Sequence, residues 1–117
     1  MMLFKKELEA AMITDTAKLM LLARGYRVWR QNNLTVRRRK GIVTLGVSDI
    51  IGYHKRTGVF IACEVKKIGD VFSPKQIEFL QEVHAAGGVA LYATEEKGTV
   101  VLKEFSEFII KPKKQKK

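Results

Sequence analysis

Apolar residues recur at helical spacing in the first part of the chain. Residues 5–24 carry one at about every fourth position, and Gly25 follows them, which predicts a helix over this range. Thr14 lies in a stretch that forms helix poorly, so the helix could also begin again there with Thr14 as its cap. The apolar positions of this predicted helix are Leu8, Met12, Ala17, Met20 and Leu21.

Runs of β-branched and aromatic residues, bounded by glycines and charged residues, predict strands in the rest of the chain. A second helix is predicted from Ser73 to about residue 86. Ser73 and Gln76 have the spacing of a capping box, and Pro74 suits the first helical position. The predicted strands are residues 26–30, two segments of residues 46–66 on either side of a turn at 54–58, residues 89–94, and residues 99–102 after a turn at 95–98. The order α-β-β-β-α-β-β predicts an α/β fold, a mixed β-sheet flanked by a helix on each face.

Three charged residues interrupt the most apolar part of the sequence. Asp49 lies in the second predicted strand, while Glu64 and Lys66 lie in the third. Side chains alternate along a strand, so Glu64 and Lys66 share one face, and Ile61 and Cys63 point to the other face as core. Because unpaired buried charge costs free energy, the three charged side chains need partners.

A divalent metal would supply such a partner. Asp49 and Glu64 on adjacent strands could chelate Mg²⁺, which prefers a few carboxylates together with waters and phosphate oxygens. Lys66 would lie beside the ion, where it could orient or deprotonate an attacking water or neutralise charge on phosphorus. The alternative is a buried ion pair of Lys66 with Glu64 or Asp49 that performs no chemistry.

Composition narrows the class of protein. The 117 residues suit one domain, and 22 Lys and Arg against 12 Asp and Glu give a net charge of +10, which favours a polyanionic partner such as nucleic acid. One cysteine excludes an internal disulfide and suits a reducing cytoplasm, and two histidines without ligand spacing argue against zinc. No segment suits a membrane span or a signal peptide, so we expect a cytoplasmic, intracellular domain without a membrane partner.

Basic residues are concentrated in two segments. Residues 37–40 are four consecutive cations that predict the exposed tip of a loop or hairpin, which either contacts DNA phosphates or only aids solubility. Residues 106–110 predict a short helix, and residues 111–117 a basic disordered tail that adds non-specific affinity for nucleic acid or takes no part. The candidate nucleic-acid contacts are Arg30, Arg37, Arg38, Arg39, Lys40 and Lys67. Trp29 is interpreted as core or dimer surface, with base stacking as the alternative.

An ordered series of motifs resembles a known family. The series G-x-S-D-I-I-G, E-V-K, S-P-x-Q-x-x-F-L and A-G-G-x-A is similar to that of the VRR-NUC (virus-type replication-repair nuclease) domain. This domain is a branch of the PD-(D/E)xK superfamily, which includes archaeal Holliday-junction resolvases. The resemblance spans roughly residues 7–94, and Ser48 stands where the superfamily name has proline.

The resemblance implies a restriction-endonuclease-like core, with residues 1–110 as a single domain that hydrolyses DNA with Mg²⁺, or Mn²⁺ in its place. It implies that Asp49, Glu64 and the carbonyl of Val65 bind the metal and that Lys66 positions the attacking water. Family members also carry a glutamate on the first helix that points at the metal. Glu9 is the first choice because Ile13, Ala17 and Leu21 follow it at steps of four, with Glu7 and Asp15 as alternatives. Gln76 either approaches the active site, as in related nucleases, or only caps its helix.

The resemblance also indicates a substrate. Small stand-alone members act as homodimers that nick opposed strands of four-way (Holliday) junctions, which suggests a phage-type junction endonuclease here. No residue set predicts reading of base edges, so recognition of DNA shape is expected. Two alternatives remain open: a non-catalytic nucleic-acid-binding module on the nuclease fold, and a nicking endonuclease without branch preference.

Overall fold

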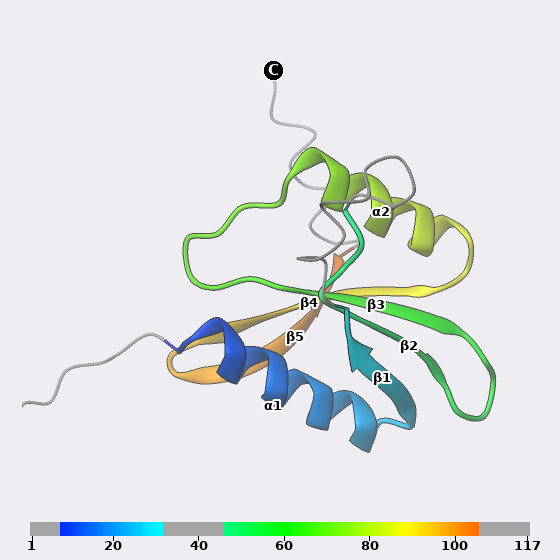
Figure 1. Cartoon of the computed structure of the whole chain (residues 1–117), viewed down its shortest axis with the longest axis horizontal. Coiled ribbons are helices and arrows are strands. Elements are labelled where there is room, and N and C mark those ends of the chain that lie inside the picture. The colour runs from blue at the N-terminus through cyan, green and yellow to red at the C-terminus, as the bar shows by residue number, and fades with distance from the viewer. Residues whose placement is uncertain (1–7, 32–45, 106–117) are drawn as a thin grey trace, which may run out of the picture.

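The structure is a computed structural model, and it describes residues 8–31 and 46–105 (Figure 1). The order of its helices and strands is the predicted α-β-β-β-α-β-β. The elements are α1 (Ala10–Ala23), β1 (Tyr26–Arg30), β2 (Ile50–His54), β3 (Phe60–Val65), α2 (Pro74–Ala85), β4 (Val89–Glu96) and β5 (Thr99–Glu104). The predicted runs at 37–40, 106–110 and 111–117 lie outside the described residues.

The five strands form one mixed sheet in the order β1-β2-β3-β4-β5. Among the described strands, only β3 and β4 pair in parallel, which requires the crossover that α2 supplies; the other neighbours pair antiparallel. Figure 1 shows α1 on one face of the sheet and α2 on the other. The predicted α/β fold, a mixed sheet flanked by helices, is therefore confirmed.

The two faces of the sheet hold separate hydrophobic clusters. On one face, α1 packs its fully buried residues Ile13, Ala17 and Leu21 against Ile61 and Cys63 of β3. On the other face, α2 packs Leu80 and Val83 against Ala62 and Ala90. Glu64 and Lys66 thus lie on the α2 face, and the prediction that they share a face opposite Cys63 is confirmed.

Helix α1 differs from the prediction at its start. Among the residues described, Leu8 and Glu9 precede the helix, and Glu9 has an extended backbone with φ −74° and ψ 153°. The helix does not begin again at Thr14, because the Thr14 hydroxyl donates to the Ala10 carbonyl at 2.9 Å within an unbroken helix. Met12 is also not part of the buried stripe, since 51% of it is exposed.

The segments next to β2 and β5 also differ from the prediction. Residues 46–49 form a turn and bend rather than a strand, so β2 begins at Ile50. The turn expected at 95–98 is shorter, because Glu95 and Glu96 still pair with β5. Lys97 and Gly98 alone make the turn, with φ of 53° and 80°, a conformation that matches the twist of a hairpin. No helix in the described part of the chain is both long and apolar enough to cross a membrane.

Candidate active site

Asp49 and Glu64 meet where β2 begins and β3 ends. The antiparallel register pairs Ile50 with Cys63, which brings the preceding Asp49 beside Glu64 and Val65. The Val65 amide donates to Asp49 Oδ2 at 2.9 Å, and the Gln31 amide donates to the Asp49 carbonyl at 2.7 Å. The backbones on both sides of β2 therefore fix Asp49 next to Glu64.

Glu64 is a buried carboxylate with one open oxygen. Only 2% of the residue is exposed, and its Oε2 accepts a short hydrogen bond from Gln76 Nε2. Within the described chain, Oε1 and the hydroxyl of the neighbouring Ser48 are buried and make no hydrogen bond of normal geometry, although Ser48 and Asp49 both lie close enough to this carboxyl group to shift its pKa. A buried carboxylate oxygen without a partner is costly, and a bound cation would remove that cost.

Burial, as the largest cause, and the nearby Asp49 carboxylate together raise the pKa of Glu64 to about 8, although the Lys66 ammonium partly offsets both. Burial also raises the pKa of the Cys63 thiol, with contributions from the carboxylates of Glu64 and Asp49, so Cys63 stays a protonated core residue. The site thus resists holding two negative charges on its own and favours a positive ion between them.

Without divalent metal, the protein is expected to lose stability as the pH rises from the ordinary pKa of Glu64, 4.5, to its folded value of about 8. In this window the unfolded chain ionises Glu64 and the folded state keeps its proton, so the free energy of unfolding falls by at most about 1.4 kcal/mol per pH unit. Thermal melts across this range, with chelator or with Mg²⁺, measure the effect. Mg²⁺ should remove the loss in the wild type, and Glu64→Gln should show neither the loss nor the rescue. A Mg²⁺ rescue that persists in Glu64→Gln would place the ion elsewhere.

Lys66 is held away from solvent by neutral acceptors. Its Nζ donates to the Val71 carbonyl and to Gln76 Oε1, both at 2.8 Å, and lies 4.8 Å from the centre of the Phe72 ring. The two ion pairs of the described residues lie elsewhere, at Lys75–Glu78 and Lys103–Glu96. The alternative of a direct ion pair between Lys66 and a site carboxylate is therefore wrong, because Gln76 stands between Lys66 and Glu64.

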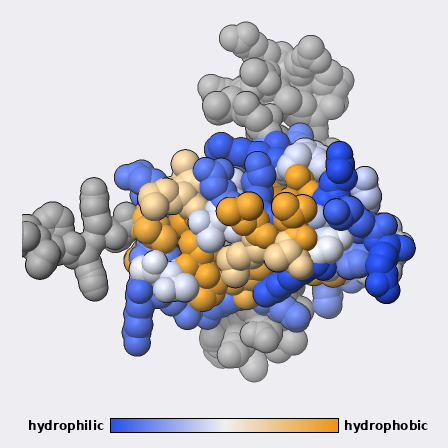
Figure 2. Space-filling model, turned by 90° about the horizontal axis from the view of Figure 1, so that it is seen from below, coloured by the Kyte–Doolittle hydropathy of each residue, from blue (hydrophilic) through white to orange (hydrophobic). Residues whose placement is uncertain are grey.

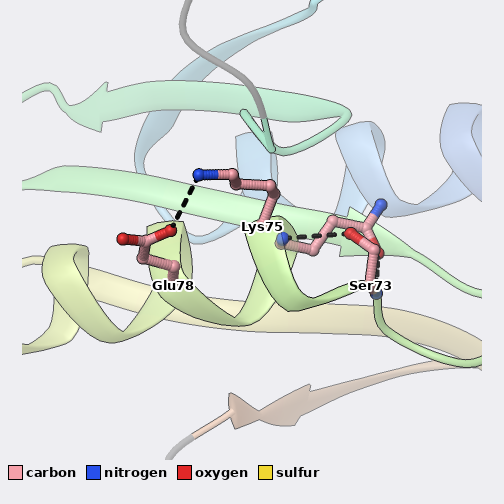
Figure 3. A network of polar contacts seen from close by, with 4 residues as sticks. Ser73, Lys75 and Glu78 are labelled. Atoms are coloured by element: carbon pink, nitrogen blue, oxygen red, sulfur yellow. Dashed lines mark hydrogen bonds and ion pairs between the residues drawn. The ribbon is translucent and has the colours of Figure 1, made fainter.

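Gln76 both caps α2 and takes part in the site. Its Oε1 accepts from the Ser73 amide at 2.9 Å, and Ser73 Oγ accepts from the Gln76 amide at 3.1 Å, which completes the predicted capping box (Figure 3). The same Oε1 accepts from Lys66, while Nε2 donates to Glu64. The expectation that one side chain serves only one of these roles is wrong, because an amide oxygen has two lone pairs and the NH₂ group donates separately.

For the DNA hydrolysis that the resemblance implies, replacing Gln76 by alanine is expected to lower the cleavage rate about 10- to 100-fold, the usual cost of losing a group that orients a ligand or a catalytic side chain. Ser73→Ala is the matched control, because it removes only the hydrogen bond that Ser73 Oγ accepts from the Gln76 amide and costs about 1 kcal/mol of stability. Cleavage rates and thermal melts of both variants separate the two roles. Equal losses of activity in both variants would reduce Gln76 to a helix cap.

None of the described contacts joins Glu9, the first choice for the acidic residue of the first helix, to this site. Glu9 is exposed, has no side-chain capping bond, and is not helical, so the spacing that was expected to hold it near the buried face does not apply. The start of α1 is instead tied to β4, where the Leu8 amide donates to Glu95 Oε1 at 2.7 Å. Asp15 is exposed near Leu19 and Trp29, and Glu7 lies outside the described residues. Glu9 as a metal ligand stays a prediction.

The two carboxylates fit a small, hard cation. The described residues contain no group of three or more His, Cys, Asp or Glu side chains that could hold a metal, so Asp49 and Glu64 stand as a pair. Mg²⁺ commonly uses one or two carboxylates and fills its other positions with waters and phosphate oxygens. The open Glu64 Oε1 is the oxygen such an ion would take. Val65 engages Asp49 through its amide, and its carbonyl as a ligand stays a prediction.

Two of the candidate DNA contacts lie close to this site. Arg30 is exposed and pairs with Ile50, the residue after Asp49. Lys67 follows Lys66 directly, and its amide donates to Asp70 Oδ2 at 2.9 Å. Residues 37–40 lie outside the described chain, so their predicted role is unchanged.

Sequence reasoning missed the neighbours that set up the site. Val71 and Phe72 hold the Lys66 ammonium, and Ser48 places a buried hydroxyl beside Glu64. The only signal was indirect: Phe72 directly precedes the helix cap at Ser73, a position from which a side chain packs back onto the core.

The site and the fold together can be compared with known proteins. Seventeen chains of solved structures are similar to this one. One is Hjc from Archaeoglobus fulgidus, described as a Holliday junction resolvase from an archaeal hyperthermophile. The match covers 82% of this chain and 77% of that chain, with 17% identity and a TM-score of 0.56. The chain thus has the restriction-endonuclease-like fold that the resemblance implied. No model of a protein family matches it, and no curated protein matches it.

Proposed function

We propose that this protein is a metal-dependent DNA endonuclease of the VRR-NUC branch. The observation that carries the proposal is the pairing of Asp49 with Glu64, whose Oε1 is buried and open, beside the ammonium of Lys66. The alternative of a non-catalytic module has no such support, because all three chemical groups are present together where β2 begins and β3 ends.

Each side chain has a defined task in this proposal. Asp49 and Glu64 would hold Mg²⁺ or Mn²⁺, which would act as a Lewis acid on the scissile phosphate and its attacking water. The ammonium of Lys66, a residue that is only 9% exposed, would orient that water and neutralise charge that develops on the phosphate oxygens. Gln76 fixes the distance between Glu64 and Lys66 by hydrogen bonds to both.

The surface charge supports DNA as the substrate. The chain carries a net charge of +10, and Arg30 and Lys67 flank the site. We expect these cations, the run at residues 37–40 and the tail at 111–117 to bind the phosphate backbone, which gives affinity for DNA without reading its sequence.

Four-way junctions are the proposed DNA structure, cut by paired nicks from a homodimer. The support is the shared fold with an archaeal Holliday junction resolvase and the motif series that resembles VRR-NUC domains. A dimer with two-fold symmetry would place one active site at each of two symmetry-related strands of a four-way junction, which has the same symmetry.

Comparison of a labelled junction with flap, single-stranded and linear duplex DNA of the same sequence tests this preference. Cleavage restricted to the junction supports the proposal. Equal cleavage of linear duplex would leave a nicking endonuclease without branch preference, and binding without cleavage would leave the non-catalytic module.

A further inference from the structure

A hollow of about 510 Å³ lies beside the candidate active site. It is lined by the loop of residues 67–72, which follows Lys66, and by residues of β4 and β5. We call it the β4 hollow. Its volume falls within the range of about 300–1,000 Å³ that is usual for ligand-binding clefts. Its apolar and aromatic walls are Ile68, Val71, Phe72, Ile77 and Tyr92.

The register of the sheet places the β4 hollow next to Glu64. Tyr92 of β4 pairs with Glu64 of β3, so the two residues lie side by side on strands about 4.8 Å apart. The Tyr92 ring meets the Phe72 ring edge to face, with ring centres 5.5 Å apart. The Lys66 ammonium, which also lines the hollow, lies 4.8 Å from the centre of the Phe72 ring. A group in the hollow would therefore be the immediate neighbour of a phosphate bound at Glu64 and Lys66.

The loop that forms the outer wall of the hollow has a fixed conformation. The Asp70 amide donates to the Lys67 carbonyl at 3.0 Å, and the Val71 carbonyl accepts from Lys66 Nζ at 2.8 Å. Ile68 and Val71 are nevertheless 52% and 79% exposed. Figure 1 shows this connection between β3 and α2 extending to one side of the sheet. The loop thus presents two apolar side chains, already ordered, to a molecule that binds at the site.

The charges around the β4 hollow favour an uncharged occupant. Among the described residues, its charged lining is balanced and consists of Lys66, Lys67, Lys103, Asp70, Glu95 and Glu96. Each of the three carboxylates already accepts a hydrogen bond or forms an ion pair. A phosphate gains little from such a balanced lining. A flat nucleobase, by contrast, can stack on aromatic rings and pack between apolar side chains.

We propose that the β4 hollow binds one unpaired nucleobase of DNA, next to the phosphate at Glu64 and Lys66. The inference rests on the proposed function for the identity of DNA as the ligand. A paired base is held inside the duplex and cannot enter the hollow, whereas a base at a branch point or an extrahelical base can. The hollow would therefore select DNA whose base pairing is open beside the cleaved bond, without reading the sequence.

Binding of a short duplex with one extrahelical nucleotide tests the proposal. The comparison DNA has the same backbone, but its extrahelical nucleotide lacks the base. Fluorescence anisotropy with the full chain in chelator should show about 5- to 100-fold tighter binding of the base-bearing DNA, the range for stacking of one base. The ratio of the two dissociation constants reports on the base alone, because all phosphate contacts are shared.

Two substitutions in the β4 hollow should lower this ratio. Thr94 is half-buried in the lining, and Thr94→Trp should bring the ratio close to one because the added ring fills the hollow. Tyr92→Leu removes a ring on which the base can stack, whereas Tyr92→Phe keeps the ring and should keep the ratio. Thermal melts identify the folded variants. General damage to DNA binding would weaken the affinity for both DNAs and leave the ratio unchanged.

Leu19→Ala is the matched control for an exposed apolar side chain away from the hollow. Figure 2 views the molecule from the α1 side and shows apolar side chains gathered at the centre of this face. Leu19 of α1 is 67% exposed, and α1 lies on the opposite face of the sheet from Glu64. The variant should keep the wild-type ratio, because exposed apolar surface alone does not bind the base.

Equal affinity of the wild type for both DNAs, or binding of neither, would overturn the proposal. A ratio that a folded Thr94→Trp variant leaves unchanged would also overturn it. The nuclease proposal fails separately, since binding in chelator requires no cleavage. A preference for the base without cleavage in Mg²⁺ or Mn²⁺ would support the hollow and contradict the nuclease; cleavage without a preference for the base gives the reverse result.

Discussion

Replacement of Glu64 by glutamine is expected to abolish DNA cleavage and to leave a folded protein that still binds DNA. Glutamine keeps the shape of the side chain and can still accept the bond from Gln76, but it removes the negative charge that a metal requires. The loss should exceed about 1000-fold, the upper range for loss of one electrostatic contact to a transition state. Rates on labelled DNA in Mg²⁺, with binding measured in chelator, separate chemistry from affinity.

Glu78→Gln is the matched control, because Glu78 is an exposed carboxylate on α2 whose ion-pair partner among the described residues is the exposed Lys75 (Figure 3). Lys66→Ala should lower the rate by a similar factor, since it removes the cation that Val71 and Gln76 hold at the site. Normal cleavage by Lys66→Ala would exclude Lys66 from the mechanism. Lost DNA binding in Glu64→Gln would mean that the carboxylate serves the fold rather than the reaction.

Gly46→Ala is expected to destabilise the protein and to impair cleavage together. Gly46 has φ of +82°, and a Cβ there would lie 2.2 Å from the backbone oxygen of Lys75. Left-handed backbone costs an L-residue about 1–2 kcal/mol, and a forced clash in a packed region adds about 1–3 kcal/mol. Gly46 packs against Lys75 at the start of α2 and shortly precedes Asp49 in the sequence. Relief of the clash therefore has to move the segment that carries Asp49.

Gly58→Ala is the control, because it introduces the backbone strain without the clash. Gly58 has a nearly equal φ of +79°, but apart from its chain neighbours no atom of the described residues lies within 4 Å of the Cβ position. It should therefore lose only the strain, about 1–2 kcal/mol, and keep its cleavage rate. Chemical denaturation and Mg²⁺-dependent cleavage of both variants measure the difference. Equal stability of the two variants would contradict the close packing of Gly46 on α2.

The order of helices and strands could be predicted because each segment carries its own periodicity. The alternation along β3 was enough to place Glu64 and Lys66 on one face and Cys63 on the other. The capping box at Ser73 marked the start of α2 because its residues interact with each other locally. These features need no knowledge of distant contacts.

The remaining features depend on how distant segments meet. The double role of Gln76 exists only because the start of α2 approaches β3, so sequence alone presented its two roles as alternatives. Glu95 and Glu96 resemble turn residues in composition, yet pairing with β5 extends β4 through both. Glu9 was placed by helical spacing, and its extended backbone removes that argument. The β4 hollow became visible only once β4 was placed beside the loop that follows Lys66.

The most direct test of the central claim is the cleavage of a labelled four-way junction in Mg²⁺, with matched linear duplex and Asp49→Asn alongside. Asparagine keeps the acceptor for the Val65 amide and removes the charge, so the fold around the site should persist. Paired, symmetric nicks on the junction that vanish in Asp49→Asn are the predicted result. Binding of the junction by the wild type without cleavage in Mg²⁺ or Mn²⁺ would contradict the claim that Asp49, Glu64 and Lys66 form a nuclease site.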